Sequence, residues 1–278
     1  HGFADIHDMK SFRANVPVQT FDTLHPYIEQ QIAGKSALTI DPTVFCAKTS
    51  GTTGRSKLIP VTKNGLRQMR LSQRLLSFSA WRSTGFFSGA ILVMVGPTIE
   101  GRFENGVAFG SSSGSAYKSL PRLLAAKFAV PAKTFELPDV AAKYQIYALA
   151  ALSRADISGI AAANPSSILK VCEIIEADKE LLLNALETRS SEHLHPAVVE
   201  VVEAVFQKID TERLQNLRVA LQNDGRLSPE VVWPKLAAIV TWTGGSCGVA
   251  LSKLRNSLPA SVNVVECGYA ASEFMGTF

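Results

Sequence analysis

Stretches of continuous apolar residues alternate with amphipathic stretches along most of the chain. Three apolar runs have the length and branched side chains of buried strands: 43–47 (TVFCA), 90–95 (AILVMV) and 236–242 (LAAIVTW). A shorter run at 262–265 (VNVV) has the same character. Between these runs, apolar positions recur at helical spacing, as in residues 62–79 and over most of 139–221. This alternation of strand and helix signals predicts an α/β fold.

Small and polar residues follow three of the predicted strands. Residues 48–57 (KTSGTTGRSK) follow the first, residues 243–246 (TGGS) follow the third, and residues 266–273 (ECGYAASE) follow the fourth. In open α/β sheets, ligands bind beyond the carboxyl ends of the strands. We therefore expect the chemistry of this chain to lie in these three loops.

The first loop has the composition of a phosphate-binding loop. Phosphate oxygens need converging backbone N–H groups, hydroxyl donors, a cation and glycines that let the backbone come close. The residues that supply these groups lie within one turn of chain, and they are Ser50, Gly51, Thr52, Thr53, Gly54 and Lys57. The loop therefore predicts a nucleotide-phosphate site with Lys57 as its cation.

Two other interpretations of this loop fit its residues less well. The P-loop of NTPases requires glycine before the lysine and serine or threonine after it, whereas Ser56 and Leu58 occupy these positions. A flexible Ser/Gly/Thr linker has no reason to place a lysine and then Leu-Ile-Pro after its glycines. A phosphate loop outside the P-loop class is the better interpretation.

The motif TSGTTGRSK (49–57) resembles the phosphate loop of the adenylate-forming superfamily, which includes acyl-CoA synthetases and nonribosomal peptide adenylation domains. Its continuation, KLIPVT (57–62), resembles the auxin-responsive acyl-acid amido synthetases, in which an apolar pair and a proline follow the lysine. A second motif, CGYAASE (267–273), is similar to the Tyr-x-x-Ser-Glu motif of that family. A weaker one, VTWTGGS (240–246), resembles the small-residue loop beside the adenine. The order of these motifs makes the chain similar to that family over nearly its whole length.

The resemblance implies roles for residues of the second and third loops. Glu273 would hold Mg²⁺ against the triphosphate, since carboxylate oxygens are ligands that Mg²⁺ prefers. Ser272 would donate to the α-phosphate, and Tyr269 has the flat face needed to stack on adenine. The loop beside the adenine comprises Gly244, Gly245 and Ser246. Lys57, Ser272 and Glu273 are therefore the residues expected to take part in catalysis.

Composition and charge limit the classes of partner expected for this chain. The 278 residues are 46% hydrophobic and 19% charged, as in a globular domain with a sizeable core. The net charge of +4 is not concentrated in Lys/Arg runs, so we expect no nucleic-acid partner. No apolar run has the length of a bilayer span, so we expect no membrane partner. The four cysteines are widely spaced and indicate reduced thiols in a cytoplasmic protein; they are Cys46, Cys172, Cys247 and Cys267.

The expected activity is an ATP-dependent ligation. By resemblance, a small carboxylic acid is adenylated by ATP with Mg²⁺, and an amine, commonly an amino acid, then takes the acyl group as an amide. The predicted fold is the N-terminal large domain of an adenylate-forming enzyme, with mixed β-sheets flanked by helices, over residues 1–278. The Tyr-x-x-Gly-Asp motif and the small C-terminal domain of the family have no counterpart in these residues. We therefore expect an incomplete domain with little activity of its own.

Two other functions stay open on the sequence alone. An acyl-CoA ligase would use a thiol in place of the amine. A protein that has lost its second domain would bind nucleotide without catalysis. The first of these differs from the amido synthetase in its acceptor, and the second differs in having no reaction at all.

Overall fold

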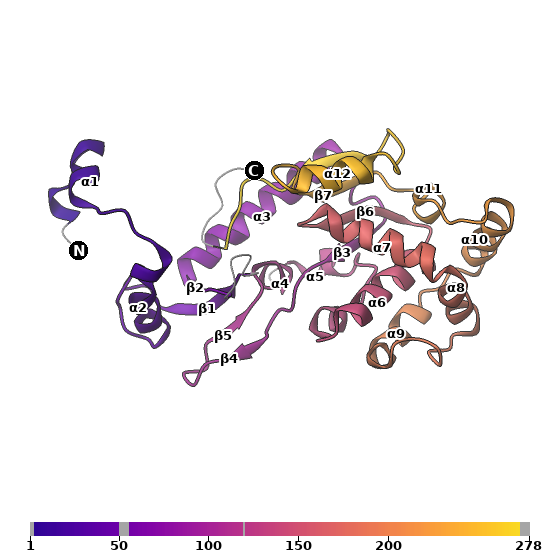
Figure 1. Ribbon diagram of the computed structural model, residues 1–278, viewed down its shortest axis with the longest axis horizontal. Coiled ribbons are helices and arrows are strands. Elements are labelled where there is room, and N and C mark those ends of the chain that lie inside the picture. Colours follow the sequence, from indigo (N-terminus) through magenta and orange to yellow (C-terminus); the bar gives the residue numbers. More distant parts are fainter. Residues whose placement is uncertain (1–2, 50–55, 119, 273–278) are drawn as a thin grey trace.

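The computed structural model describes residues 3–49, 56–118 and 120–272, and these residues form two β-sheets flanked by helices (Figure 1). The α/β class and the mixed sheets expected from the sequence are confirmed. The N-terminal region contains a 3₁₀ turn, η1 (Phe3–Asp5), and the helices α1 (Met9–Asn15) and α2 (Phe21–Ile32). No residue of α1 is buried, and this helix lies at one end of the molecule (Figure 1).

The first sheet is mixed, with its strands in the order β2-β1-β5-β4. β1 pairs antiparallel with β2 and parallel with β5, and β5 pairs antiparallel with β4. The strands are β1 (Thr43–Lys48), β2 (Leu58–Thr62), β4 (Gly101–Arg102) and β5 (Ala108–Gly110). The predicted phosphate loop therefore lies between two paired strands of this sheet.

Both faces of the mixed sheet have small buried clusters. Successive side chains of a strand point to opposite faces. Cys46 of β1 packs with Ile28 and Ile32 of α2 on one face. Phe45 and Ala47 form the cluster on the other face, against side chains of β2 and α3 (Lys63–Ser83). This part of the molecule is therefore held by few fully buried side chains.

The second sheet is entirely parallel, with its strands in the order β3-β6-β7-β8. These strands are β3 (Ala90–Met94), β6 (Ile157–Ala162), β7 (Ala238–Thr241) and β8 (Asn263–Glu266). The strands expected at 90–95, 236–242 and 262–265 are confirmed. β3 and β7 are buried along their whole length, and most buried side chains of the described residues belong to one core around this sheet.

Helices fill the connections between the parallel strands. From β3 to β6 the chain also forms α4 (Ser112–Lys118), α5 (Arg122–Ala125), η2 (Ala132–Glu136) and α6 (Val140–Ser153). From β6 to β7 it forms α7 (Pro165–Ala177), α8 (Lys179–Thr188), η3 (Pro196–Val198), α9 (Val199–Phe206), α10 (Thr211–Asp224) and α11 (Pro229–Val232). α12 (Cys247–Arg255) joins β7 to β8. Among the described residues, no helix combines the length and the apolarity that a membrane span requires.

Four strands of the described residues, β2, β4, β5 and β6, are not indicated by the sequence pattern. β6 interrupts residues 139–221, where the pattern is mostly helical, because its Ile-Ser-Gly-Ile-Ala-Ala sequence has few of the branched residues that mark strands. β2 directly follows the phosphate loop, and α3 begins only after it. The hydroxyl of Thr62 accepts from the Gly65 N–H at 3.1 Å, so Thr62 is the N-cap of α3.

Candidate functional site

The phosphate loop is closed at its base by a pair of hydrogen bonds. Thr49 N–H donates to the carbonyl oxygen of Lys57 at 2.9 Å, and Lys57 N–H donates to Thr49 Oγ1 at 3.0 Å. These bonds continue the β1–β2 ladder by one residue beyond the Lys48–Leu58 pair. The backbone of Lys57 is therefore fixed by the hairpin. Residues 50–55, and with them the predicted Ser50, Gly51, Thr52, Thr53 and Gly54, lie outside the described residues.

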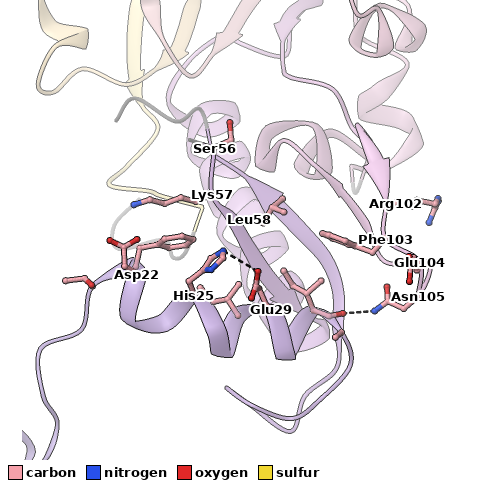
Figure 2. Close-up of a pocket in the computed structure, with 15 residues that line it drawn as sticks. Asp22, His25, Glu29, Ser56, Lys57, Leu58, Arg102, Phe103, Glu104 and Asn105 are labelled. Atoms are coloured by element: carbon pink, nitrogen blue, oxygen red, sulfur yellow. Dashed lines mark hydrogen bonds and ion pairs between the residues drawn. The ribbon is translucent and has the colours of Figure 1, made fainter. Parts of the chain in front are cut away.

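The side chain of Lys57 lies in an open groove between α2 and the β4–β5 turn (Figure 2). The groove has a volume of about 1400 Å³. Its walls carry both signs of charge, from Lys57 and Arg102 and from the carboxylates of Asp22, Glu29 and Glu104 (Figure 2). Lys57 Nζ lies 4.7 Å from the centre of the Phe21 ring, at the first position of α2. Lys57 thus contacts Phe21 of α2, a helix whose position beside the loop could not be inferred from the sequence.

A second, apolar cavity lies where the strands of the parallel sheet end. Its volume is about 350 Å³, and it is bounded by residues at the ends of β3, β6 and β7, by α3 and α4, and by residues after β8. Aromatic and aliphatic side chains line it, among them Met69, Leu76, Phe87, Tyr117 and Phe128. Among the described residues that line this cavity, none carries a charge. The cavity therefore suits an apolar body of modest size.

Serine hydroxyls from two distant segments meet at this cavity. Ser112 Oγ donates to Ser272 Oγ at 3.2 Å, and both residues line the cavity. The Ser112 loop is held against the end of β3, because Gly96 N–H donates to Ser113 Oγ at 3.1 Å. A Cβ at Gly114 would lie 2.6 Å from the Pro97 carbonyl oxygen, so glycine is required for this close approach. Two serines at the start of α4, Ser112 and Ser113, thus line the cavity.

The loops that follow β7 and β8 are tied together. Trp242 Nε1 donates to the Gly268 carbonyl at 3.1 Å, and Thr243 N–H donates to a Glu266 carboxylate oxygen at 2.8 Å. The predicted adenine loop continues from there, and its Gly244, Gly245 and Ser246 are exposed. Gly245 has φ +57°, a conformation that favours glycine. Tyr269 follows Gly268 and is 71% exposed, so its ring is accessible to a ligand at the surface.

The predicted metal ligand, Glu273, lies outside the described residues. Among the described residues, no cluster of three or more His, Cys, Asp or Glu side chains could hold a metal ion. Ser272 precedes Glu273 in the sequence, and its hydroxyl lies 3.2 Å from that of Ser112. Carboxylate and hydroxyl oxygens suit Mg²⁺. The donors of Glu273, Ser272 and Ser112 therefore fit the expected metal in their chemistry.

Cys267 lines the apolar cavity, and its thiol is kept protonated. Burial raises the pKa of Cys267 to about 12, and the nearby Glu266 carboxylate adds to the effect. Burial likewise raises the pKa of Cys46, in β1, to about 11. Thiols with such pKa values carry almost no thiolate at neutral pH and are poor nucleophiles. This agrees with the interpretation of both residues as core thiols.

The structure groups the predicted residues into two places. Ser272 lies at the apolar cavity, and the Gly244–Ser246 loop is joined to the Tyr269 segment through Trp242. Lys57 lies in the other groove, beside α2. Thr49 is the first residue of the TSGTTGRSK motif, although the sequence does not indicate its part in closing the loop. Phe21 is not indicated by the sequence, because its approach to Lys57 depends on tertiary packing. The contact of Ser112 with Ser272 depends on tertiary packing as well.

Comparisons with known proteins match the whole of this architecture. The model of the GH3 family N-terminal domain matches residues 1–262. The fold is shared with a solved structure of GH3.15 acyl acid amido synthetase, with a TM-score of 0.76 and 23% identity. It is also shared with AtGH3.15 acyl acid amido synthetase in complex with 2,4-DB, with a TM-score of 0.78 and 24% identity. A search of curated proteins found no match.

The chain spans about half the length of these solved relatives. The two matches cover 97% of this chain, but only 48% and 49% of the respective relative. The coverage agrees with the expectation that this chain corresponds to the N-terminal part of such an enzyme.

Proposed function

Because the chain belongs to the GH3 family, whose N-terminal domain model matches residues 1–262, we propose that it is the acid- and ATP-binding part of an acyl-acid amido synthetase. The single observation that carries this proposal is the cavity at the ends of the parallel strands. It combines an apolar interior without charged side chains, among the described residues, with a pair of hydroxyls from Ser112 and Ser272. The relatives' names, and the complex of one of them with 2,4-DB, support the same assignment.

The acid substrate would place its apolar body in the cavity and its carboxylate near the two serines. Burying an apolar group here is favourable, whereas burying the carboxylate among the aromatic side chains would cost several kcal/mol. The carboxylate therefore stays at the polar edge, where Ser112 and Ser272 can donate to it. This orientation directs the reacting oxygen toward the loops that are expected to hold ATP.

The nucleotide would be held by residues of all three loops. Lys57 and the hydroxyls of Ser50, Thr52 and Thr53 would contact the β- and γ-phosphates, and Tyr269 would stack on the adenine beside Gly244, Gly245 and Ser246. Ser272 would donate to the α-phosphate, and Glu273 would hold Mg²⁺. When bound, the metal ion supplies positive charge that offsets the negative charge of the phosphates. The proposed reaction uses no nucleophile of the protein, which agrees with the raised pKa of Cys267.

The proposed reaction has two steps. A carboxylate oxygen of the acid attacks the α-phosphorus of ATP, the bond to the bridging oxygen breaks, and pyrophosphate leaves. An amine then attacks the acyl carbon, loses a proton and forms an amide while AMP leaves. In the first step, the protein would stabilise the negative charge of the phosphates with preorganised hydrogen-bond donors. Lys57 would be the main cation among these donors.

Acid binding to the chain can be tested at the cavity itself. Leu76 lines the cavity, while its neighbour Leu75 is 45% exposed and lies outside the cavity lining. Leu76→Trp should fill the cavity and weaken calorimetric binding of phenylbutyrate by about tenfold or more, whereas Leu75→Trp should leave it unchanged. Phenylbutyramide, which lacks the carboxylate, should bind more weakly than the acid. Equal binding by both variants would reject the cavity as the acid site.

The reaction class can be tested by exchange of labelled pyrophosphate into ATP. Because little activity is expected of residues 1–278 alone, this assay uses a longer protein that contains them. Exchange should require an acid, and Lys57→Ala should abolish most of it, because a charge-assisted contact worth about 1.5–3 kcal/mol is lost. With an acid that supports exchange, an amino acid should yield an amide. Formation of a thioester with coenzyme A in place of the amide would identify an acyl-CoA ligase and reject the amido synthetase.

A further inference from the structure

The helix α2 presents one row of side chains to the groove that contains Lys57. Its start is fixed by a capping box, in which Thr20 N–H donates to Thr23 Oγ1 at 3.0 Å and Thr23 N–H donates to Thr20 Oγ1 at 3.4 Å. Phe21 is therefore the first residue of the helix. His25 and Glu29 follow at intervals of four residues and share its face. All three residues line the groove.

The residues of this row contact one another in sequence. The rings of Phe21 and His25 are 5.4 Å apart between centres, and His25 Nε2 lies 3.8 Å from Glu29 Oε1 (Figure 2). The same side of the helix is anchored, because Ile28 and Ile32, which also line the groove, are buried against Cys46 of β1. Asn105 of the β4–β5 turn donates to the Ile32 carbonyl at 2.6 Å and holds the far end of the helix (Figure 2). The ring of Phe21 is thus carried by a helix that is fixed to the same sheet as Lys57.

The backbone and the side-chain ammonium of Lys57 are held by different contacts. Its backbone is held by the paired hydrogen bonds to Thr49, at 2.9 and 3.0 Å. Its ammonium lies 4.7 Å from the centre of the Phe21 ring, within the distance at which a ring face attracts a cation. We infer that Phe21 is a positioning residue for the phosphate-loop lysine, and that its ring holds the ammonium of Lys57 in place for an anionic ligand. The inference rests on the phosphate role proposed for Lys57.

An aromatic ring suits this task better than a carboxylate would. A carboxylate partner would neutralise the lysine and compete with phosphate for its N–H donors. A ring face attracts the ammonium without accepting a conventional hydrogen bond from it, so its charge and N–H groups stay available. Phe21 would therefore restrict the position of Lys57 without reducing its affinity for an anion. The effect should appear in phosphate binding and not in acid binding at the other cavity.

The contact itself can be measured without any nucleotide. Lysines of the full 278-residue chain are reductively methylated with ¹³C-formaldehyde, which keeps their charge, and the Lys57 signal is identified by its loss in Lys57→Arg. In the wild-type chain, the ring current of Phe21 should displace this signal upfield of the other lysine signals. Phe21→Tyr should retain the displacement, and Phe21→Leu should remove it. A wild-type signal among the other lysines would overturn the inference.

The consequence for phosphate is measured by calorimetric titration with ATP and Mg²⁺. Phe21→Leu keeps an apolar side chain for packing and should weaken ATP binding by about 2- to 5-fold, as expected for loss of an exposed cation–π contact. Phe21→Tyr should stay near wild type, and phenylbutyrate binding should not change in either variant. Equal ATP affinity of Phe21→Leu and wild type would overturn the inference.

A further variant separates this inference from the proposed function. If Lys57→Ala leaves ATP affinity unchanged, the phosphate role of Lys57 fails and the role of Phe21 fails with it. In that case the Lys57 signal would still be displaced upfield, because the ring contact is present. Loss of the ring contact alone would instead leave the signal undisplaced. A melting temperature of Phe21→Leu close to that of Phe21→Tyr would show that the difference in ATP binding does not come from unfolding.

Discussion

The two sheets of this molecule support their loops in different ways. The parallel sheet lies in one large core, with β3 and β7 buried throughout, and the loops at its ends are joined by hydrogen bonds such as that from Trp242 to Gly268. The mixed sheet has only two small clusters, one around Cys46 and one around Phe45, and its phosphate loop is closed by contacts of Thr49 and Lys57. The proposed acid cavity is thus part of the core, whereas the proposed phosphate lysine depends on a few identifiable contacts.

This difference predicts how each region responds to change. Regions with few buried apolar contacts open locally at a lower free energy than core strands do. Substitutions around the acid cavity should lower global stability together with function. Substitutions around the lysine should alter ATP binding while the fold hardly changes. Four experiments test or sharpen this contrast.

The largest expected effect concerns one thiol in each region, the buried Cys46 and the partly buried Cys267. Burial raises the pKa of Cys46, in the mixed sheet, to about 11, and that of Cys267, at the acid cavity, to about 12. At pH 8 their thiolate fractions are then only about 10⁻³ and 10⁻⁴. Iodoacetamide should therefore alkylate both at least about 100-fold more slowly in the native chain than in guanidinium chloride.

The sign of the pH dependence follows from the raised pKa values. Since both pKa values lie above 10, the rate of alkylation of the native chain should rise steadily from pH 8 to pH 10 without a plateau. Mass spectrometry of digested samples measures each site separately. A plateau near pH 9, or a rate at pH 8 that equals the rate in denaturant, would contradict the buried state of the thiol concerned. If the mixed sheet opens more readily, Cys46 should react faster than its native pKa predicts.

The second experiment compares the same substitution, isoleucine to alanine, in the two regions. Ile160 is fully buried in β6, within the large core, and Ile28 is buried in the small cluster of α2. Ile160→Ala should lower the free energy of unfolding by about 4 kcal/mol, because its rigid surroundings cannot collapse into the space. Ile28→Ala should cost about 2 kcal/mol, since α2 can move toward the sheet. Urea denaturation measures both, and equal losses would remove the distinction between the two cores.

A glycine of the parallel sheet provides a smaller effect. A Cβ at Gly159, in β6, would lie 2.7 Å from the ring and the carbonyl oxygen of Phe86. Gly159→Ala should therefore destabilise the chain by about 1–3 kcal/mol through overpacking. Gly244→Ala is the control, because a Cβ there meets nothing within 4 Å. Thermal melting that leaves both variants unchanged would show that Phe86 can move aside, and that this part of the core is less rigid than its burial suggests.

Much of the parallel sheet could be predicted from the sequence, for a physical reason. Strands buried on both faces are continuous apolar runs, and β3 and β7 follow this rule. β8 is indicated only by its two central valines, because Asn263 and Glu266 at its ends are exposed. β6 does not follow the rule, because its Gly159 and its alanines are small residues that fit against Phe86 and neighbouring strands. Its strand character comes from its partners in the sheet. The pattern of the chain itself contains no such information.

The motifs of the candidate site could be predicted from the sequence. The arrangement of its residues in space could not. The composition of the loop around Lys57 and the CGYAAS segment with Ser272 indicates polar chemistry at strand ends. The meeting of Ser112 with Ser272, 160 residues apart, and the approach of Phe21 to Lys57 are products of folding. Periodicity and local composition report on neighbours in sequence. Contacts between distant segments require the three-dimensional structure. The roles of Lys57, Ser272 and the other motif residues stay predictions.

Thr49 is the residue through which the contrast between the two regions can be tested most finely. Its hydroxyl accepts from the Lys57 N–H at 3.0 Å, while its own N–H donates to the Lys57 carbonyl at 2.9 Å. Thr49→Val removes the first bond and keeps the second, which should cost about 0.5–1.5 kcal/mol locally. Because the lysine backbone is then held by one bond, ATP affinity should fall severalfold. Thr49→Ser keeps the hydroxyl and should bind ATP like the wild type.

The matched change in the parallel sheet is Thr241→Val. The Thr241 hydroxyl is fully buried and donates to the Ala163 carbonyl at 3.3 Å. Thr241→Val removes the hydrogen bond of a buried hydroxyl, so it should lower the melting temperature without a specific effect on ATP. Thr49→Val should do the reverse, with weaker ATP binding and a nearly unchanged melting temperature. If both variants lose stability equally and bind ATP alike, the hairpin is as firmly built as the core, and the phosphate lysine needs no support of its own.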